Sequence, residues 1–296
     1  MTTFIQSHHL RRFFPYFALV FGTLGLGFSA IFVKWANAPG AVSGFYRVAI
    51  AAAVMAVPFG IEVRRRAPVS RHHLLIAALG GLFFAADLAA WNTSVLLTSA
   101  ASATLFGNTS PLWVSLGALL LFKEKLQPRF WAGLALAMIG TVAIISQDIS
   151  TQPSVGWGSL LAIIAGVFYA GFFLATQRAR EGLCSLTSWW VSAAISTVAL
   201  LAASLALEQP LTGYPAHTYR SLIGVALITQ VGAYLAINYA LGHLPASIVS
   251  PTLLGQPVLT ALLAVPLLRQ PLHAAQIAGG AVVLAGIWIV NTQKRS

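Results

Sequence analysis

The chain contains one segment twice, and the second copy has lost most of its charges. Residues 122–145, FKEKLQPRFWAGLALAMIGTVAII, match residues 268–290, LRQPLHAAQIAGGAVVLAGIWIV, at a constant spacing of 146 residues. The spacing aligns Gly133 with Gly279 and Gly140 with Gly286. The first copy carries four charged side chains, Lys123, Glu124, Lys125 and Arg129, whereas the second carries only Arg269. Two copies of one fold that differ in charge are expected to face different surroundings.

The scarcity of charge excludes an ordinary soluble domain. Charged residues make up 8% of the chain and hydrophobic residues 58%, whereas soluble domains carry about 25% charged residues. Lipid-facing surface needs no charge, and helices satisfy their own backbone groups in a bilayer. The net charge of +11 comes from short basic clusters between apolar runs, unlike the basic face of a nucleic-acid binder. We therefore predict an all-α membrane protein with the lipid bilayer as a partner and no nucleic acid.

Ten stretches are long and apolar enough to span a membrane as helices. They are 13–33, 38–61, two between 74 and 122, 130–146, 157–177, 183–207, two between 221 and 268, and 270–291. The first run is longer than the apolar core of a signal peptide, and Lys34 follows it directly. We therefore interpret it as a retained first helix.

The distribution of Lys and Arg predicts the orientation. If the N-terminus is inside, the cytoplasmic segments hold most of these residues and the outer loops hold only Arg220 and Arg269, as expected for an inner-membrane protein. Five helices per repeat is an odd number, so the second copy enters the membrane upside down and its loop after the fourth helix faces outward. We expect a multi-pass protein with both termini cytoplasmic, in which residues 1–147 and 148–296 form two inverted five-helix repeats around a central cavity.

Two segments resemble a known family. TSAASATLFGNTSPLWVSLGALLLFKEKLQPRFWAGLALAMIGTVAII (98–145) and GFYRVAIAA (44–52) are similar to the EamA-type branch of the drug/metabolite transporter superfamily, and most like its YddG-type aromatic amino acid exporters. In the second half, Gln270 replaces the family's loop glutamate. The resemblance implies ten helices, cytoplasmic termini and a cavity walled by helices 1, 3, 4, 6, 8 and 9. It also implies the direction of transport, which is export.

Asp87 is the only acidic residue deep within a predicted span. A charge at the bilayer centre costs about 2.5–3.5 kcal/mol on insertion scales, so it is expected to face a cavity or a cation. One interpretation is a structural ion pair with Arg47 or Lys34. The other is a functional role, in which Asp87 binds a substrate ammonium group or a coupling proton.

Polar and aromatic residues recur on matching faces of the third and eighth helices. Asp87, Trp91 and Asn92 share one face, and Gln230 and Asn238 lie on the corresponding face of the second copy. The asparagines either form interhelical hydrogen bonds or contact a substrate; the aromatic stripe of the sixth helix either packs or holds an aromatic ligand. The candidate substrate-binding residues are Asp87, Trp91, Asn92, Asn108, Tyr169, Phe173, Gln230, Tyr234, Asn238 and Gln256.

Pro111 and Pro257 lie inside the fourth and ninth predicted helices. A proline within a helix frees a backbone carbonyl, which is tolerated at membrane depth beside a cavity or polar side chains. The two prolines are candidate kinks, either for packing or for gating. Small residues on the fifth and tenth helices predict a close contact between them: Gly133, Ala137, Gly140, Gly279 and Gly286.

Transport is the predicted function. The chain has no G-x-x-x-x-G-K-[ST] and no H-E-x-x-H motif, and Cys184 is its only cysteine, so we expect no cofactor, no metal and no enzymatic activity. An intramembrane lipid-modifying enzyme would need a converging catalytic set that the spans lack. We expect a secondary transporter, acting as a monomer, that exports aromatic and other neutral amino acids by alternating access. The alternative is export of other small metabolites or drugs on the same fold. No fixed cation is placed for a substrate carboxylate; helix ends and Lys34 are the candidates.

Overall fold

The computed structural model of the chain describes residues 2–65, 69–97, 106–151, 157–256, 258–259, 262–263 and 274–292. Every regular element within these ranges is a helix. The elements of the first half are α1 (Thr2–Gly27), α2 (Ser29–Ala36), α3 (Gly40–Val54), α4 (Ala56–Arg65), α5 (Arg71–Leu97), α7 (Ser110–Leu121) and α8 (Pro128–Thr151). Those of the second half are α9 (Trp157–Ala179), α10 (Ser185–Ala206), α11 (Ala216–Gly224), the π-helix η1 (Val225–Ala233), α12 (Tyr234–Leu241), α13 (Ala246–Thr252) and α15 (Ala274–Asn291).

The helices are those of a multi-pass membrane protein. Within the described residues, five helices are long and apolar enough to cross a membrane, or six if α3 and α4, bent by 50°, form one span. Further apolar helices are shorter: 110–121, 128–143 and 277–291. The predicted count of ten spans therefore exceeds what these helices establish. The prediction rests on the length of apolar stretches alone, and the structure interrupts several of these stretches with turns or bends.

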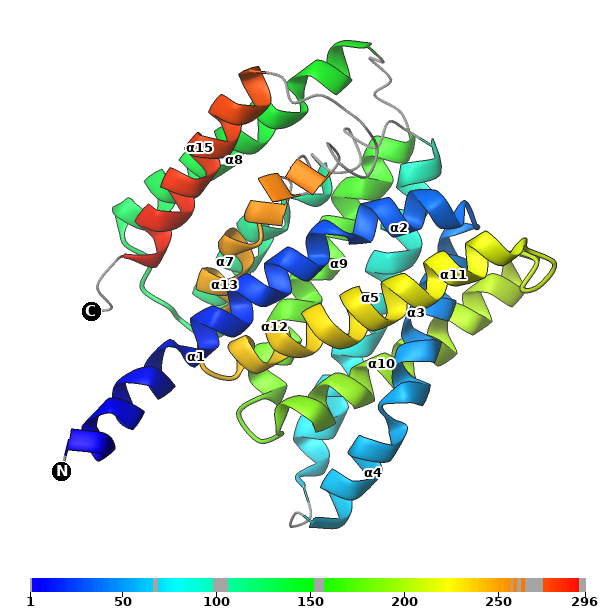
Figure 1. Ribbon diagram of the computed structural model, residues 1–296, viewed down its shortest axis with the longest axis horizontal. Coiled ribbons are helices and arrows are strands. Elements are labelled where there is room, and N and C mark those ends of the chain that lie inside the picture. The colour runs from blue at the N-terminus through cyan, green and yellow to red at the C-terminus, as the bar shows by residue number, and fades with distance from the viewer. Residues whose placement is uncertain are drawn as a thin grey trace.

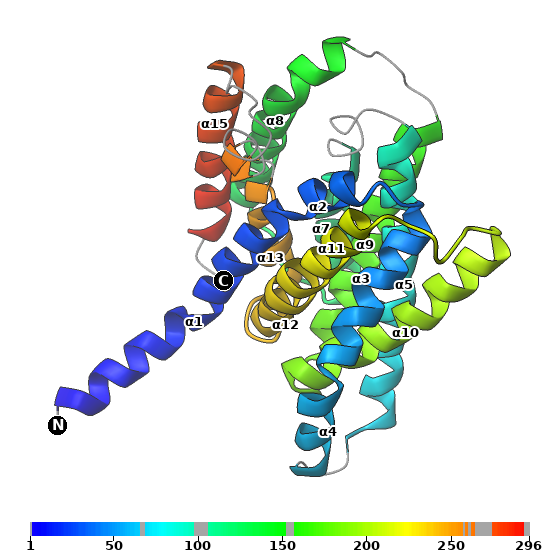
Figure 2. The ribbon, with the colours of Figure 1, turned by 45° about the vertical axis from the view of Figure 1, so that its right-hand side comes forward.

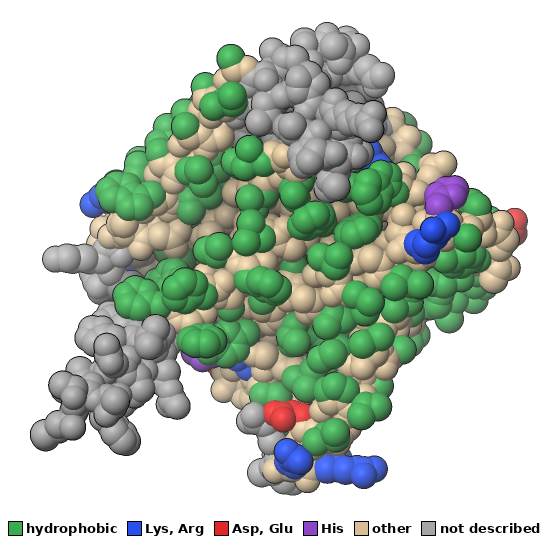
Figure 3. Space-filling view, viewed as in Figure 1, with side chains coloured by type: hydrophobic (Ala, Val, Ile, Leu, Met, Phe, Trp, Pro, Cys, Tyr) green, Lys and Arg blue, Asp and Glu red, His purple; other side chains and the backbone are tan. Residues whose placement is uncertain are grey.

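The surface has the pattern expected of a protein in lipid. Figure 3 shows one face covered mainly by hydrophobic side chains, with charges gathered at the tip of α4 and near the start of α11. On α4, Arg64 and Arg65 are exposed, whereas Leu120 of α7 exposes 79% of its surface and Leu75 of α5 exposes 70%. Leucines this exposed are unfavourable in water but suit contact with acyl chains.

Helices α8 and α15 lie side by side along one edge of the molecule (Figures 1 and 2). Their contact is made through glycines: a Cβ atom at Gly140 would lie 2.6 Å from the backbone nitrogen of Val283, and one at Gly133 would lie 3.0 Å from the carbonyl oxygen of Gly286. Only residues without a Cβ allow two helices to approach this closely. The predicted glycine contact between these helices is confirmed.

The remaining helices form a bundle around α5. It packs against α3, α9 and α10, while α1 packs against η1 and α12 (Figure 1). The buried core of this bundle includes Phe84 of α5, Phe173 of α9 and Trp189 of α10. Small residues bring the helices together, since a Cβ at Gly81 would lie 2.5 Å from the carbonyl oxygen of Ser192. This tight packing fixes the helices that carry the polar residues described next.

Candidate functional site

A pocket lies where the two halves of the bundle meet. Its lining is Ser29, Arg47, Asp87, Leu88, Trp91, Gly107, Asn108, Ser110, Pro111, Tyr169, Tyr234, Ser250, Leu253 and Gln256. These residues come from α2, α3, α5, α7, α9, α12, α13 and the turns beside α7 and α13. Concave sites between helices that combine apolar walls with a few polar groups are typical ligand sites.

The lining follows the internal repeat. Three pairs of lining residues are separated by 146 positions: Leu88 with Tyr234, Gly107 with Leu253, and Ser110 with Gln256. Both copies of the repeat therefore supply equivalent backbone positions to one pocket.

Seven of the predicted residues line the pocket: Asp87, Trp91, Asn108, Pro111, Tyr169, Tyr234 and Gln256. Four others do not line it: Asn92, Phe173, Gln230 and Asn238. Pro257 lies outside the described residues. Helical periodicity brought the α5 residues together, because Asp87, Leu88 and Trp91 lie on one face of a continuous helix.

The first predicted span breaks beside the pocket. Helix α1 ends at Gly27, Phe28 forms a turn, and α2 begins at Ser29. Side chains of the second half use carbonyl oxygens near this break: Gln256 Nε2 donates to Leu26 O at 3.3 Å and Thr229 Oγ1 donates to Gly25 O at 3.4 Å. Backbone groups at membrane depth need such partners, so the break becomes a polar part of the pocket wall.

Arg47 is a buried cation within the pocket, with 3% of its surface exposed. Its Nε donates to Gln230 Oε1 at 2.9 Å and its NH1 donates to Ser29 Oγ at 3.1 Å. The guanidinium carbon lies 5.2 Å from the centre of the Tyr234 ring, close enough for a cation–π interaction. Arg47 is predicted from the sequence only as an ion-pair partner and is not among the predicted site residues, although a lone charge within an apolar helix is a signal for such a role.

Asp87 has no ion pair and no hydrogen bond among the described residues, although only 8% of its surface is exposed. Arg47 is close enough to influence it electrostatically, but their N and O atoms are not within ion-pair distance. Lys34, the other candidate partner, is exposed. Asp87 therefore lines the pocket, and neither Arg47 nor Lys34 pairs with its carboxylate oxygens.

Aromatic rings form the wall contributed by α9 and α12. The hydroxyl of Tyr234 donates to that of Tyr169 at 3.1 Å, and the ring of Tyr234 lies 4.9 Å from that of Phe84. Phe173 is fully buried behind Tyr169, with their ring centres 4.7 Å apart and nearly perpendicular. Phe173 thus supports the wall through packing, while the two tyrosines line the pocket.

Gln230 holds Arg47 and lies in a segment that the sequence did not predict, the π-helix η1. The Nε1 group of Trp189 donates to the carbonyl oxygen of Gln230 at 3.1 Å, which satisfies a group in the altered backbone pattern. π-Helical segments occur frequently at functional sites. In the other half, position 84 corresponds to Gln230 and lies in the regular helix α5.

The two asparagines differ in their surroundings. Asn92 Nδ2 donates to Gly40 O at 2.9 Å, which ties α5 to the start of α3 and matches the interhelical interpretation. Asn238 is also buried, yet neither atom of its amide has a hydrogen-bond partner within the described part of the chain. Asn92 and Asn238 therefore occupy equivalent positions in the two repeats but do not make equivalent contacts.

Pro111 differs from the prediction of a kink inside a helix. It lies in the first turn of α7, after a turn at Asn108 and Thr109. The first turn of a helix tolerates proline because its N–H groups have no intrahelical partner there. The structure thus starts a new helix at the pocket where sequence reasoning expected a bent one. Pro251, which the sequence analysis did not single out, is buried within α13.

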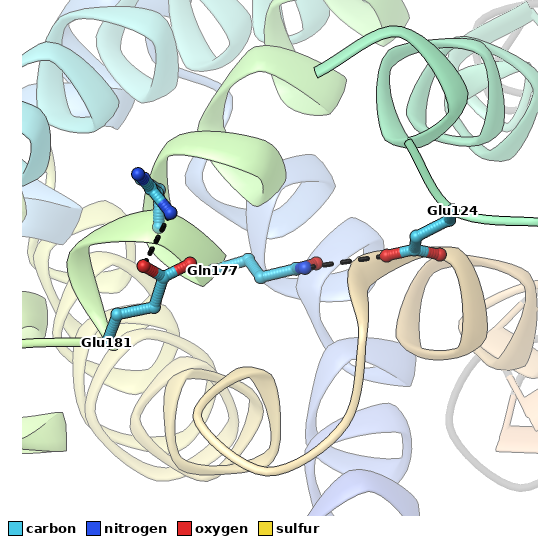
Figure 4. Close-up of polar contacts among 4 residues, drawn as sticks. Glu124, Gln177 and Glu181 are labelled. Atoms are coloured by element: carbon cyan, nitrogen blue, oxygen red, sulfur yellow. Dashed lines mark hydrogen bonds and ion pairs between the residues drawn. The ribbon is translucent and has the colours of Figure 1, made fainter. Parts of the chain in front are cut away.

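A polar cluster of Glu124, Gln177, Ala246 and Ser247 joins the two halves beyond the pocket. Figure 4 shows the contact between Gln177 and Glu124. Gln177 Nε2 donates to Glu124 Oε1 at 3.5 Å, and the hydroxyl of Ser247 donates to Glu124 Oε2. The backbone N–H of Ala246 donates to Gln177 Oε1. The cluster therefore connects α9 and the first turn of α13 to the segment after α7.

The end of α7 directs Glu124 toward this cluster. Lys123 adopts a left-handed conformation with φ 53°, and the N–H of Glu124 donates to Ala118 O at 3.2 Å. A left-handed residue just after the last helical turn is a common helix ending that reverses the chain. Glu181, by contrast, turns away toward Arg178 and pairs with it at 2.6 Å on the surface (Figure 4).

Comparisons with known proteins agree with this fold. The model of the EamA-like transporter family matches the chain twice, over residues 13–146 and 156–292. A solved crystal structure covers 93% of this chain, and is itself covered to 95%, with a TM-score of 0.76 and 18% identity. At that identity the likeness concerns the fold alone.

Among curated proteins, the chain is similar to a "Probable amino-acid metabolite efflux pump" of Salmonella typhimurium, 30% identical over 60% of this chain. The match spans 62% of the Salmonella protein's own length. A protein of Escherichia coli with the same description is 27% identical over 57% of this chain and 59% of its own. An "Uncharacterized transporter" of Archaeoglobus fulgidus is 25% identical over 75% of this chain and 76% of its own.

Proposed function

We propose that this chain, which belongs to the EamA-like transporter family, is a secondary carrier that exports amino acids and prefers aromatic and other bulky neutral ones. The family match makes the chain a transporter and not an intramembrane lipid-modifying enzyme. Amino acids as substrates are supported by the pocket and by the names of the similar Salmonella and Escherichia proteins.

The observation that carries the proposal is the unpaired Asp87 in a pocket walled by aromatic rings. A buried carboxylate without a partner is costly, and a substrate ammonium group would supply the missing charge. Trp91, Tyr169 and Tyr234 line the same pocket and suit a flat apolar side chain. Aromatic pairs contribute about 0.5–1.5 kcal/mol each beyond area burial, enough to favour phenylalanine over alanine without excluding other neutral amino acids.

We propose ten helices in two inverted repeats, residues 1–147 and 148–296, with both termini in the cytoplasm of an inner-membrane protein. Three observations support the repeats: the double family match, the pocket pairs separated by 146 residues, and corresponding helix contacts. The contact of α5 with α9 corresponds to that of α12 with α1, and the contact of α10 with α5 corresponds to that of α3 with η1. Inverted repeats around a midplane site are the usual basis of alternating access. The export direction follows from the descriptions of the relatives.

The test is uptake of radiolabelled phenylalanine by proteoliposomes preloaded with unlabelled phenylalanine. The wild-type protein should accumulate label without chemical change, and alanine should compete weakly. Asp87→Asn, nearly isosteric, should fold and melt as the wild type does, yet transport about 10- to 100-fold more slowly, since hydrogen bonds to charged groups contribute about 1.5–3 kcal/mol.

The matched control is Glu181→Gln, which removes a surface carboxylate that pairs only with Arg178 among the described residues. It should transport like the wild type. Liposomes that move cationic drugs or nucleotide sugars but no amino acid would overturn the substrate claim. A fully active Asp87→Asn protein would overturn the role of Asp87.

A further inference from the structure

We infer that Arg47 recognises the substrate carboxylate, so that the pocket selects dipolar amino acids over amines and over carboxylic acids. This inference rests on the proposed function and names the second charge of the same site. It is carried by the contacts of Arg47, which the sequence alone did not assign.

Arg47 has only neutral hydrogen-bond partners. A guanidinium offers five N–H donors, and the structure gives Arg47 two side-chain bonds, to Gln230 and Ser29. No acidic side chain of the described residues lies within ion-pair distance of it. A buried cation without a contacting anion is costly, so the guanidinium of Arg47 lacks a carboxylate partner at hydrogen-bond distance.

The free donors lie on the terminal edge of the guanidinium. Nε and one N–H of NH1 donate to Gln230 and Ser29, and Tyr234 is the other side chain in contact with the guanidinium. NH2 forms no hydrogen bond with any further residue in the described part of the chain. The two terminal nitrogens are a fork that matches the two oxygens of a carboxylate. The hydrogen bonds to Gln230 and Ser29 fix the position of the side chain before the substrate arrives, so less entropy is lost on binding.

Asp87 and Arg47 lie in the same pocket without touching. An amino acid carries its ammonium and carboxylate groups on one carbon, so it can contact both side chains at once. Bound in this way, the substrate neutralises two buried charges of opposite sign. A molecule that lacks either group leaves one of them unpaired, and that penalty discriminates more strongly than a lost attraction alone.

The first experiment uses the wild-type protein and therefore does not depend on any variant folding. Labelled phenylalanine uptake is competed with unlabelled phenylalanine, phenylalaninamide, 2-phenylethylamine and 3-phenylpropanoate. Each analogue that lacks one charged group should compete at least tenfold more weakly than phenylalanine. If phenylalaninamide competes as well as phenylalanine, the inference fails while the proposed function stands. If phenylalanine is not transported at all, the proposed function fails and the inference fails with it.

The second experiment assigns the selectivity to Arg47. Arg47→Gln should slow phenylalanine uptake and also bring the competition constants of phenylalanine and phenylalaninamide together. Arg47→Lys, which keeps the charge but not the fork, should retain part of the preference. A residue that is merely structural would alter uptake without altering this ratio. The control is Arg220→Gln, because Arg220 is exposed and, among the described residues, its guanidinium bonds only the carbonyl of Ala216. A wild-type ratio in a folded Arg47→Gln protein would overturn the assignment.

Discussion

Replacing Gly286 by alanine should push apart α8 and α15, two helices that contribute no residue to the pocket lining. A Cβ atom at Gly286 would lie 2.5 Å from the backbone nitrogen of Ala137 and 2.6 Å from the carbonyl oxygen of Gly133. Both neighbours are backbone atoms of α8 and cannot rotate away. Since ordinary contact begins at 3.4 Å, α8 and α15 must move apart by about 0.9 Å at this point.

The expected cost follows from two opposing effects. Overpacking a tight contact typically costs about 1–3 kcal/mol, while alanine is the better helix former by up to about 1 kcal/mol. The net loss should be about 1–2 kcal/mol, and for a chain of this size each kcal/mol corresponds to a fall of about 2–4 °C in melting temperature. Because neither α8 nor α15 lines the pocket, the apparent affinity for phenylalanine should not change.

The assay is thermal unfolding of the detergent-solubilised protein, followed by loss of the monodisperse peak in size-exclusion chromatography. Gly60→Ala is the matched control, because Gly60 also lies in a helix but a Cβ there would meet nothing within 4 Å. That control should melt at or slightly above the wild-type temperature. The reasoning would be refuted if Gly286→Ala melted at the same temperature as Gly60→Ala.

Two further predictions concern topology and the polar cluster between the halves. Reporter fusions at residues 150 and 212 should be external and those at 67 and 126 internal; a cytoplasmic signal at 150 would contradict the inverted repeats. Glu124→Ala removes the acceptor of Gln177 and Ser247 and should lower the unfolding free energy by about 1–2 kcal/mol, measured by the same thermal assay. Glu208→Ala, at an exposed position, should leave the melting temperature unchanged. If Glu124→Ala and Glu208→Ala melted at the same temperature, the cluster would have no role in stability.

The parts of the fold that depend on local pattern could be predicted from the sequence. The glycine spacing predicted the contact of α8 with α15, because a residue without a Cβ allows close approach regardless of what surrounds it. The helical period placed Asp87 and Trp91 on one face, and both line the pocket. Asn92 shares that stretch but reaches Gly40 instead. The contact of Asn92 is determined by Gly40, its neighbour across the helix interface, and not by the helical period of α5.

The parts that depend on long-range contact could not be predicted. Arg47 and Gln230 are 183 positions apart, and nothing local to either residue indicates the other. The π-helical hydrogen-bond pattern of η1 has no composition signal of its own, since its residues suit an ordinary helix equally well. A proline at position 111 gives the same sequence pattern whether it bends a helix or begins one. The turn at Asn108 and Thr109 in the structure shows that Pro111 begins a helix.

The pocket joins a repeated scaffold to an unrepeated set of charges. Positions 146 residues apart supply its walls in pairs, yet Arg47 corresponds to Ala193 and Asp87 to Ala233. A pocket with full twofold symmetry would bury two cations and two anions, at a cost of about 2.5–3.5 kcal/mol for each charge left at the centre of the membrane. It would also bind a dipolar substrate equally well in two opposite directions. With one charge of each sign, both from the first half, the empty pocket buries less charge. An amino acid bound as we propose would have a single orientation relative to the second half, and its side chain would meet Tyr169 and Tyr234.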